Sequence, residues 1–425
     1  MDKELLEYAL IRTLTFPLRF LPFSWIHALG KICGLVGFYC LRTYRKRALS
    51  HIALAKDLGF SNDQIIQTAK KSFQNLAINC LEYEKLASTK DLSQVIQCEN
   101  PEAADALYAK GQGIIFFCAH QSNWEVLFLD GTTRMKGIAI GKPIKNKRLY
   151  RWIISIREKF GGTIITPKNA VKEGLRALKK GIFLGVVGDQ AMPESNYSFP
   201  FLGRRASNST APALLAYRTS SPIIFAETRR VQGGYRIRYS DPIWPDLTQS
   251  METEVIRMTD ETLRLLQESI RRCPGEWLWQ HNRWKQQTPQ VIYHPFRHDA
   301  ISVILPDDPS LISLLDTLKQ IYPLEHFSLL VPASLRSHPF PPVDELIFYT
   351  HLSETLRNDL RPKIVFNFTS YQPIERHYKR LSAFQVLTLE KLKQLASPHG
   401  SVDNLSELLK RALCRPGTLW TQHAV

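Results

Sequence analysis

A histidine and a glutamate stand close together just after a short apolar run. His120 and Glu125 belong to the segment Cys-Ala-His-Gln-Ser-Asn-Trp-Glu, which follows the apolar residues 114–117. A histidine that titrates near neutrality can take the proton of a hydroxyl group, and a carboxylate against its other ring nitrogen fixes the tautomer and stabilises the imidazolium. The pair therefore predicts a general base, His120, oriented by Glu125, as acyl transfer to a hydroxyl requires.

The two side chains meet only if the chain turns between them. On one continuous helix the spacing would rotate Glu125 well away from His120. Residues 113–118 have the pattern of a buried strand, and helix-like sequence begins after Ser122. This pattern predicts His120 at the end of a strand and Glu125 in the first turn of a helix. The alternative is a capping box, in which Glu125 accepts only the backbone N–H of Ser122.

The elements around this corner alternate between strand-like and helical patterns. Such alternation predicts an α/β fold with a central mixed sheet flanked by helices. Thr253–Arg272 has the spacing of an amphipathic helix, and residues 49–86 read as two helices broken near Gly59, with Ser61 as a cap. The strand candidates are 114–117, 137–140, 163–165, 182–187, 222–226 and 235–239.

The length of 425 residues favours two domains. Pro289 and Pro295 mark a boundary, after which a second α/β pattern has strand candidates at 301–305, 327–331, 346–349 and 364–368. We expect a membrane-anchoring helical segment at 1–47, a catalytic domain at 48–290, and a second, smaller α/β domain at 295–425. The last contains no glycine-rich phosphate loop, metal-ligand spacing or nucleophile motif, so its role stays open.

Charge and cysteine content narrow the classes of partner. The formal net charge of +16 favours an anionic partner. Lys and Arg dominate the stretch 134–180, where Glu158 and Glu173 are the only acids, so this stretch is either an anion-binding rim or a solvated face. The seven cysteines are scattered and form no Cys-x-x-Cys pair, which argues against a disulfide framework or a zinc site. We predict no metal and a reducing compartment.

The first 47 residues have a membrane-directed pattern without a cleavable signal. Two mainly apolar stretches, 8–23 and 25–41, precede a basic group at 42–47. Spanning a bilayer needs about 20 apolar residues, which 22–41 barely provides, so the segment spans the membrane or lies in its interface. If it spans, the basic group places the rest of the chain in the cytoplasm. An ordinary hairpin packed on the main domain is the alternative.

Further elements follow the His120–Glu125 corner in a fixed order. Gly188-Asp189-Gln190 ends a strand candidate, and Phe199-Pro200-Phe201-Leu202-Gly203 comes next. A tryptophan-rich element, residues 274–285, closes the series. Together these motifs resemble the late acyltransferases of lipid A biosynthesis, the lauroyl and myristoyl transferases of the lysophospholipid acyltransferase superfamily. The resemblance runs from the N-terminus to about Lys285, so residues beyond it depart from the family's pattern.

The resemblance assigns roles to residues and implies no cofactor. It makes His120 the general base and Glu125 its orienting acid. It also implies that Arg157 stabilises an oxyanion or a phosphate, and that Asp189 and Gln190 line the acceptor side. Other candidate substrate-binding residues are Asn123 and Trp124, which either shape the mouth of an acyl channel or serve as a helix-start residue and a packed indole, and Lys142, which replaces the family's arginine and leaves bidentate anion recognition open.

The resemblance also implies partners and a location. These are an acyl carrier protein thioester as donor, a lipid A precursor as acceptor, and the inner membrane of a Gram-negative bacterium with the catalytic domain facing the cytoplasm. We expect no nucleic acid, because aromatic residues are not interleaved with the basic stretch. Two other functions remain open: a glycerophosphate-type acyltransferase, which lacks support because no Glu-Gly-Thr-Arg element follows the motif, and a basic membrane-tethered polyanion-binding protein.

The tryptophan-rich element has a structural interpretation as well. Trp277, Trp279 and Trp284 can form a membrane-interface belt, but core packing is the favoured interpretation. His281 lies among them without an evident partner in the sequence, so we interpret it as structural.

Overall fold

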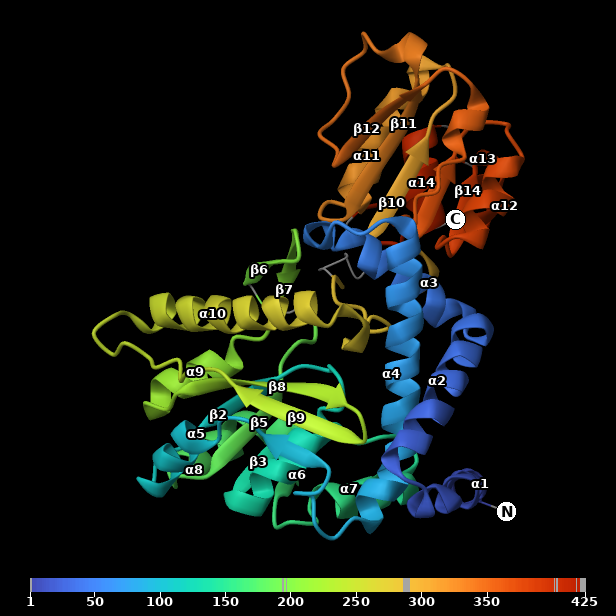
Figure 1. Ribbon diagram of the computed structural model, residues 1–425. Helices are drawn as coiled ribbons and strands as arrows, with labels where there is room; N and C mark the ends of the chain where they lie inside the picture. The colour runs from blue at the N-terminus through green and yellow to red at the C-terminus, as the bar shows by residue number, and fades with distance from the viewer. Residues whose placement is uncertain are drawn as a thin grey trace.

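The computed structural model describes residues 2–420, apart from 193, 194, 196, 286–290, 401, 403 and 418. Within that part of the chain the strands form a seven-stranded sheet, a five-stranded sheet and a small hairpin (Figure 1). The predicted α/β class, with a second α/β region at the C-terminus, is confirmed. The predicted domain boundary near Pro289 lies outside the described residues.

The seven-stranded sheet has the order β1-β9-β8-β2-β5-β3-β4. The β8–β9 pair is antiparallel and the other pairs are parallel, so the sheet is mixed, as expected. All six strand candidates of this region are strands, whereas the three-residue β1 was not predicted. The strands are β1 (Ile96–Cys98), β2 (Ile115–Cys118), β3 (Gly137–Ile140), β4 (Thr163–Ile165), β5 (Phe183–Val187), β8 (Ile223–Val231) and β9 (Gly234–Tyr239).

Helices cover both faces of this sheet because successive side chains of a buried strand point to opposite faces. Phe116 of β2 belongs to one core with Leu129 of α6, and Phe117 belongs to the other core with Met258 of α10. Figure 1 shows α9 and α10 on one side of the sheet, and α6 and α7 on the other. These helices are α5 (Glu102–Ala109), α6 (Glu125–Arg134), α7 (Lys147–Arg157), α8 (Ala170–Leu178), α9 (Ala211–Thr219) and α10 (Met251–Arg272).

The N-terminal part is helical, and α4 lies across the end of the sheet where β2 and β8 finish (Figure 1), since its Asn75 and Asn79 bond with Ser122 and Arg230. Ser61 and Gln64 form a capping box at the start of α4, which confirms the predicted cap. The hairpin of β6 (Ser198–Phe201) and β7 (Arg204–Ser207) packs near α10. The N-terminal helices are α1 (Lys3–Thr15), the 3-10 helix η1 (Phe16–Phe20), α2 (Phe23–Cys40), α3 (Arg42–Leu54) and α4 (Asn62–Ser88).

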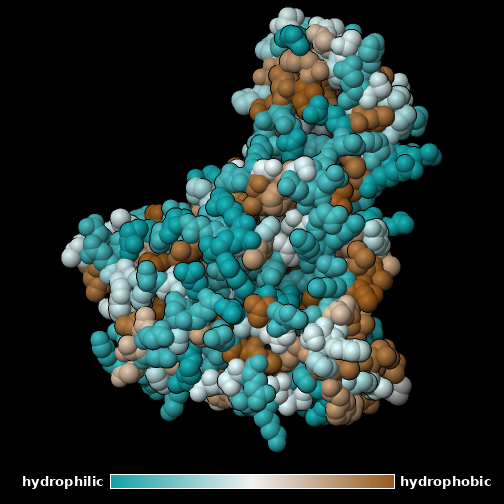
Figure 2. Space-filling view, viewed as in Figure 1, coloured by the Kyte–Doolittle hydropathy of each residue, from teal (hydrophilic) through white to brown (hydrophobic). Residues whose placement is uncertain are grey.

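Helix α2 has one face on α4 and one face in the open. Glycines permit the close approach, since a Cβ on Gly34 would lie 2.3 Å from the Cα of Gln74. On the outer face, Trp25 is 67% exposed and Ile32 is 63% exposed, and Figure 2 shows apolar side chains gathered over α1 and α2. Among the described residues, α2 is the one helix long and apolar enough to cross a membrane, and a third of it is buried against the protein.

The five-stranded sheet is parallel and has the order β12-β11-β10-β13-β14. Its four predicted strands are confirmed, while β14 was not predicted. The strands are β10 (Ala300–Ile304), β11 (His326–Pro332), β12 (Glu345–Tyr349), β13 (Ile364–Asn367) and β14 (Gln385–Thr388), and the helices are α11 (Leu314–Ile321), α12 (Pro373–Arg380), α13 (Leu389–Ala396) and α14 (Leu405–Leu413).

A buried polar cluster joins the second sheet to α3. Lys363 and Asp299 precede β13 and β10, and they form an ion pair that is almost fully enclosed. The Nζ atom of Lys363 also lies 2.8 Å from Nε2 of His51 on α3. Nearby, Ser50 donates to the carbonyl of Arg361 at 2.6 Å. The amino ends of the second sheet therefore face the N-terminal part of the molecule.

Candidate active site

The paired strands β2 and β5 bring two functional side chains together. Cys118 and Val187 are register partners, so the residues that follow them, His120 and Asp189, leave the sheet side by side. Oδ1 of Asp189 lies 2.7 Å from Nδ1 of His120, and Oδ2 accepts the backbone N–H of His120 at 2.9 Å. Oδ2 also accepts the indole N–H of Trp277 at 2.7 Å. This carboxylate is 2% exposed, and donors satisfy both its oxygens.

The pair sets the protonation state of both groups. Burial alone would lower the pKa of His120, but the charge and hydrogen bond of Asp189 outweigh it, so this pKa is raised. Burial would raise the pKa of Asp189, and the charge and hydrogen bond of His120 together with the Trp277 bond hold it well below its usual range. A neutral His120 that donates from Nδ1 presents the lone pair of Nε2, which lies 3.4 Å from the amide nitrogen of Gln190.

Glu125 has a different position from the one expected. Its carboxylate accepts Nε–H and Nη2–H of Arg157 at 2.7 and 2.5 Å, and the hydroxyl of Tyr83 at 2.8 Å. The prediction that Glu125 contacts the ring of His120 is therefore wrong, and Asp189 occupies that position. The reason is geometric, because α6 begins at Glu125 and its first turn directs the carboxylate toward α4 and α7.

The capping-box alternative does not form either. The backbone N–H of Ser122 donates to the carbonyl of Glu276 at 2.8 Å. Asn123 caps the helix start instead, since its Oδ1 accepts the backbone N–H of Glu125 at 3.1 Å. Asn123 is 1% exposed and lies behind the loop, so it does not line the cavity, and its alternative interpretation as a helix-start residue is the one that fits.

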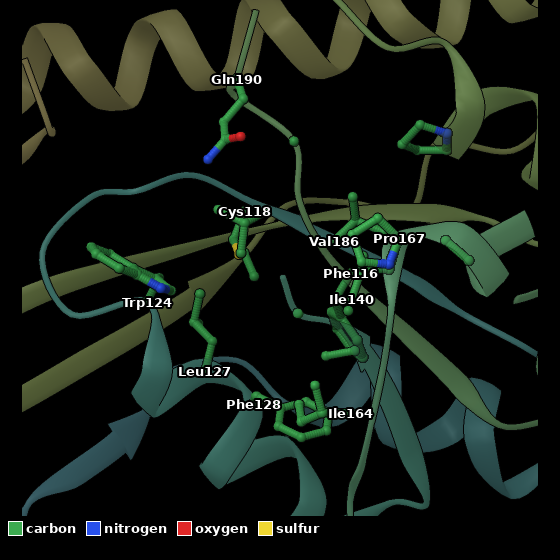
Figure 3. A pocket seen from close by; sticks show the side chains of 18 of the residues that line it. Phe116, Cys118, Trp124, Leu127, Phe128, Ile140, Ile164, Pro167, Val186 and Gln190 are labelled. Carbon is green, nitrogen blue, oxygen red and sulfur yellow. The ribbon is translucent and has the colours of Figure 1, made fainter. Parts of the chain in front are cut away.

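A cavity of about 540 Å³ opens beside His120 and extends between the sheet and its helices. In Figure 3, Gln190 and Trp124 lie toward one end, and Phe128 and Ile164 lie toward the other. Of the predicted residues, the cavity is lined by His120, Trp124, Glu125, Lys142, Arg157 and Gln190. Its deeper lining is apolar and includes Phe116, Phe128, Ile140, Ile164, Phe183, Gly185 and Val186. The arrangement combines a base, a guanidinium and a slot for an apolar chain.

Three residues near the base were missed or interpreted too simply. Trp277 is buried, as core packing predicts, yet it also donates to Asp189. The ring of His281 stacks at 6.3 Å from that of His120, and burial lowers the pKa of His281 to about 4. Tyr83 lies in the middle of a helix, where no sequence signal marks it. In the described residues no group of three or more His, Cys, Asp or Glu could hold a metal ion.

Comparison with known proteins identifies a family that is similar to most of this chain. A family model described as bacterial lipid A biosynthesis acyltransferase matches residues 3–286, which is more than half of the chain. The match includes the seven-stranded sheet, the cavity and the N-terminal helices, and it stops before the second sheet. No curated protein matches the chain.

Proposed function

Because the chain belongs to the bacterial lipid A biosynthesis acyltransferase family, we propose that it moves a fatty acyl chain from the thioester of acyl carrier protein to a hydroxyl of a lipid A precursor. The observation that carries the proposal is a histidine base, His120, held by Asp189 at the mouth of an apolar cavity. The family membership supports acyl transfer to a lipid A-type acceptor. The carrier-protein donor and the residue roles below belong to the proposal.

The chemical step needs no covalent enzyme intermediate. The acceptor hydroxyl donates to Nε2 of His120 and attacks the thioester carbonyl carbon, and its proton passes to the ring as the C–O bond forms. Asp189 stabilises the resulting imidazolium. The tetrahedral oxyanion then collapses, the C–S bond breaks, and the departing thiolate takes the proton from Nε2. General-base catalysis of this kind contributes about 10²–10⁴-fold to the rate.

Arg157 and Glu125 act as one unit in this proposal. Two nitrogens of the guanidinium are bound by the carboxylate, which fixes the plane of the group at the cavity wall. Arg157 then stabilises the oxyanion or a phosphate of a substrate, and Glu125 orients Arg157 rather than His120. Loss of an oxyanion donor lowers kcat by about 10²–10³-fold.

The surroundings of the cavity suit an acidic donor protein. Lys142 lines the cavity, and α7 and α8 carry many of the basic residues between 134 and 180. Opposite charge guides association and fixes orientation. Acyl carrier protein is acidic, so this side is where the thioester enters. Gln190, beside Nε2 of His120, lies where the acceptor hydroxyl approaches.

The N-terminal helices support a location at the inner membrane, with the catalytic part on the cytoplasmic side. The exposed apolar side chains of α1 and α2 resemble an interfacial helix pair, and the exposed Arg42 adds about 1 kcal/mol toward an anionic leaflet. Lys46 and Arg47 instead donate to the carbonyl groups of Ala383 and Gln280. Since one face of α2 is packed on α4, we propose that it lies in the interface rather than spanning the bilayer.

One experiment tests the reaction and its rivals. Purified protein is incubated with acyl carrier protein thioesters and a Kdo-bearing lipid A precursor, and the mass of the lipid is measured. We expect one added acyl chain, a rate about 10²–10⁴-fold lower for His120→Ala, and no change for His294→Ala, which replaces an exposed histidine near the second sheet. No mass gain, or a gain unaffected by His120→Ala, contradicts the proposal. Acylation of glycerol phosphate instead favours the phospholipid-type rival.

A further inference from the structure

Two buried carboxylates on α4 connect the N-terminal helices with the site. Glu82 and Glu84 have side chains that are 0% and 3% exposed. A carboxylate this deep is stable only when donors satisfy it. Glu84 forms an ion pair with Arg12 of α1, and Glu82 forms a bond with His27 of α2. Each carboxylate is therefore paired with a residue that was expected only to anchor the chain.

Glu82 collects donors from three separate parts of the chain. His27 Nε2 lies 2.7 Å from Oε1, and the amide of Asn123 donates to Oε2 at 2.7 Å. The hydroxyl of Tyr235 on β9 lies 2.6 and 2.5 Å from the two oxygens. Because His27 and Asn123 bind opposite oxygens of one carboxylate, the position of α2 bears directly on the position of Asn123.

Asn123 passes this connection to the cavity wall. Its other side-chain atom, Oδ1, caps α6 at the backbone N–H of Glu125. Glu125 in turn holds Arg157 through two hydrogen bonds. The chain of contacts from α2 to the guanidinium is therefore His27, Glu82, Asn123, Glu125, Arg157. In this series α2 contributes His27, which lies on the buried face of the helix.

A second series of contacts starts from α1 and reaches the side chain of Glu125. The guanidinium of Arg12 lies 4.4 Å from the ring centroid of Trp152. That ring is 6.1 Å from the ring of Tyr83, and the hydroxyl of Tyr83 donates to Glu125. Both N-terminal helices thus act on Glu125, one through its backbone N–H and the other through its side chain.

The two faces of α2 have different chemistry. His27 is 7% exposed and faces α4, whereas Trp25 and Ile32 are mostly exposed on the opposite side. The lipid-facing residues and the residue bound to Glu82 can therefore be changed separately. If α2 served only to anchor the protein to a membrane, its outer face would be sufficient. The contact of His27 on the inner face with Glu82 would then have no role.

We propose that α2 is part of the catalytic structure, with His27 as a positioning residue that holds Asn123 through Glu82 and so keeps Glu125 and Arg157 aligned. The outer face of the same helix binds the lipid surface. His27 touches no substrate and acts through its neighbours. This inference rests on the proposed function of the site, and it goes beyond it by assigning the N-terminal segment a role in turnover.

Variants of the two faces of α2 in the full chain test this inference. His27→Leu removes the donor, His27→Gln retains an amide donor, and Ile32→Asn changes the outer face alone. We measure kcat and KM per folded protein in detergent micelles, sedimentation with phosphatidylglycerol-containing vesicles, and folding by circular dichroism. Misplaced catalytic groups cost on the order of 10²-fold in rate, so we expect His27→Leu to lose about 10–100-fold in kcat with unchanged vesicle binding.

The control variants should show the opposite pattern. His27→Gln should recover most of kcat, and Ile32→Asn should bind vesicles less while keeping kcat in micelles. Equal kcat for wild type and His27→Leu, or loss of vesicle binding in His27→Leu without loss of kcat, overturns the inference while the proposed function stands. An inactive wild type contradicts the proposed function instead. If His27→Leu does not fold, His27→Asn, whose amide is shorter, replaces it and decides by the same readouts.

Discussion

At the scale of residues, Asp189 gives His120 its tautomer and its basicity. The bond to Nδ1 leaves the lone pair of Nε2 free for the proposed role as base, and the buried charge of Asp189 raises the pKa of the ring. The indole of Trp277 and the backbone of His120 hold the carboxylate in place. A general base is most effective when its pKa lies near the working pH. The charge and hydrogen bond of Asp189 are what raise the pKa of His120 against the effect of burial.

Replacing Asp189 by Asn should change the pH dependence of the reaction. In the proposed reaction the neutral ring is the base, so activity should rise as pH rises through the pKa of His120. Removing the charge lowers that pKa, and we expect the rise to move to lower pH. The amide also fails to enforce the productive tautomer, so the plateau should fall by about 10²–10⁴-fold. The measurement is kcat/KM against pH, with surface variant Asp57→Asn as control. An unshifted rise in Asp189→Asn would assign it to another group.

The residue types of the site could be predicted, but not all of their contacts. His120 was recognised from its motif, whereas its partner was expected from spacing along the chain. Asp189 lies beside His120 because β2 and β5 pair in parallel, and that pairing joins segments 69 residues apart. Asn123 had two interpretations, at the mouth of a channel or at a helix start, and it lies at the start of α6 behind the loop, where its amide donates to Glu82 of α4.

At the scale of elements, a glycine on β5 leaves space for the cavity. Gly185 lines the cavity between Phe183 and Val186. A Cβ placed on Gly185 would lie 3.3 Å from that of Ala139 and 3.7 Å from the ring of Phe128. A larger side chain there would fill the slot between β3 and α6. In the proposed reaction, the absence of a side chain at Gly185 therefore contributes to the length of acyl chain that the cavity accepts.

Gly185→Val should shift selectivity toward shorter acyl chains. Each methylene that can no longer be buried costs about 0.8 kcal/mol, so the ratio of kcat/KM for long to short donors should fall about fourfold per excluded carbon. The measurement is a competition between carrier thioesters of different length. Gly37→Ala, a position on α2 where a Cβ has room, serves as the control. An unchanged ratio in Gly185→Val would place the acyl chain elsewhere.

Most strands could be predicted because they are buried and apolar. The missed strands are short and contain polar residues: β1 is Ile-Gln-Cys, β7 is Arg-Arg-Ala-Ser and β14 is Gln-Val-Leu-Thr. Predicted strands of the same length, such as β4 (Thr-Ile-Ile), are more apolar. Hydrophobic periodicity over so few residues has little information. The β6 strand also contains Pro200, which reads as a loop signal although the strand lies in a two-stranded hairpin.

At the scale of the whole molecule, a buried ion pair helps to join the second sheet to the rest. Burial lowers the pKa of Lys363 to about 8, with the charge of Asp299 acting in the opposite direction. The pair also contacts His51, which in turn binds the carbonyl of Trp279 at 3.1 Å. The second sheet therefore supports the tryptophan-rich segment that holds Asp189.

Breaking this pair should destabilise the protein far more than breaking a surface pair. Lys363→Ala leaves the carboxylate of Asp299 buried without its main partner, a loss that costs about 3–5 kcal/mol in the free energy of unfolding. Lys379→Ala breaks an exposed pair with Glu375 and should cost about 0–1 kcal/mol. Urea unfolding monitored by circular dichroism compares the two. Similar midpoints for both variants would mean that water reaches Asp299.

The division into two α/β regions could be predicted from length and strand pattern, and the contacts between them could not. Lys363, Asp299 and His51 are ordinary polar residues in the sequence, and they become a cluster only when strand ends and α3 meet. The basic character of the chain was visible from composition, but the fold decides which basic residues, Lys142 and Arg157, line the cavity.

The carboxylate of Glu82 also has a consequence for biogenesis. Its three donors, His27, Asn123 and Tyr235, leave the ribosome at widely separated times. Helices α2 and α4 can pair early in synthesis. Tyr235, the last of the three donors along the chain, lies on β9, which is the last strand of the seven-stranded sheet to be synthesised. The N-terminal helices therefore cannot complete the donors of Glu82 on their own, and this carboxylate is fully satisfied only after the whole seven-stranded sheet has been synthesised.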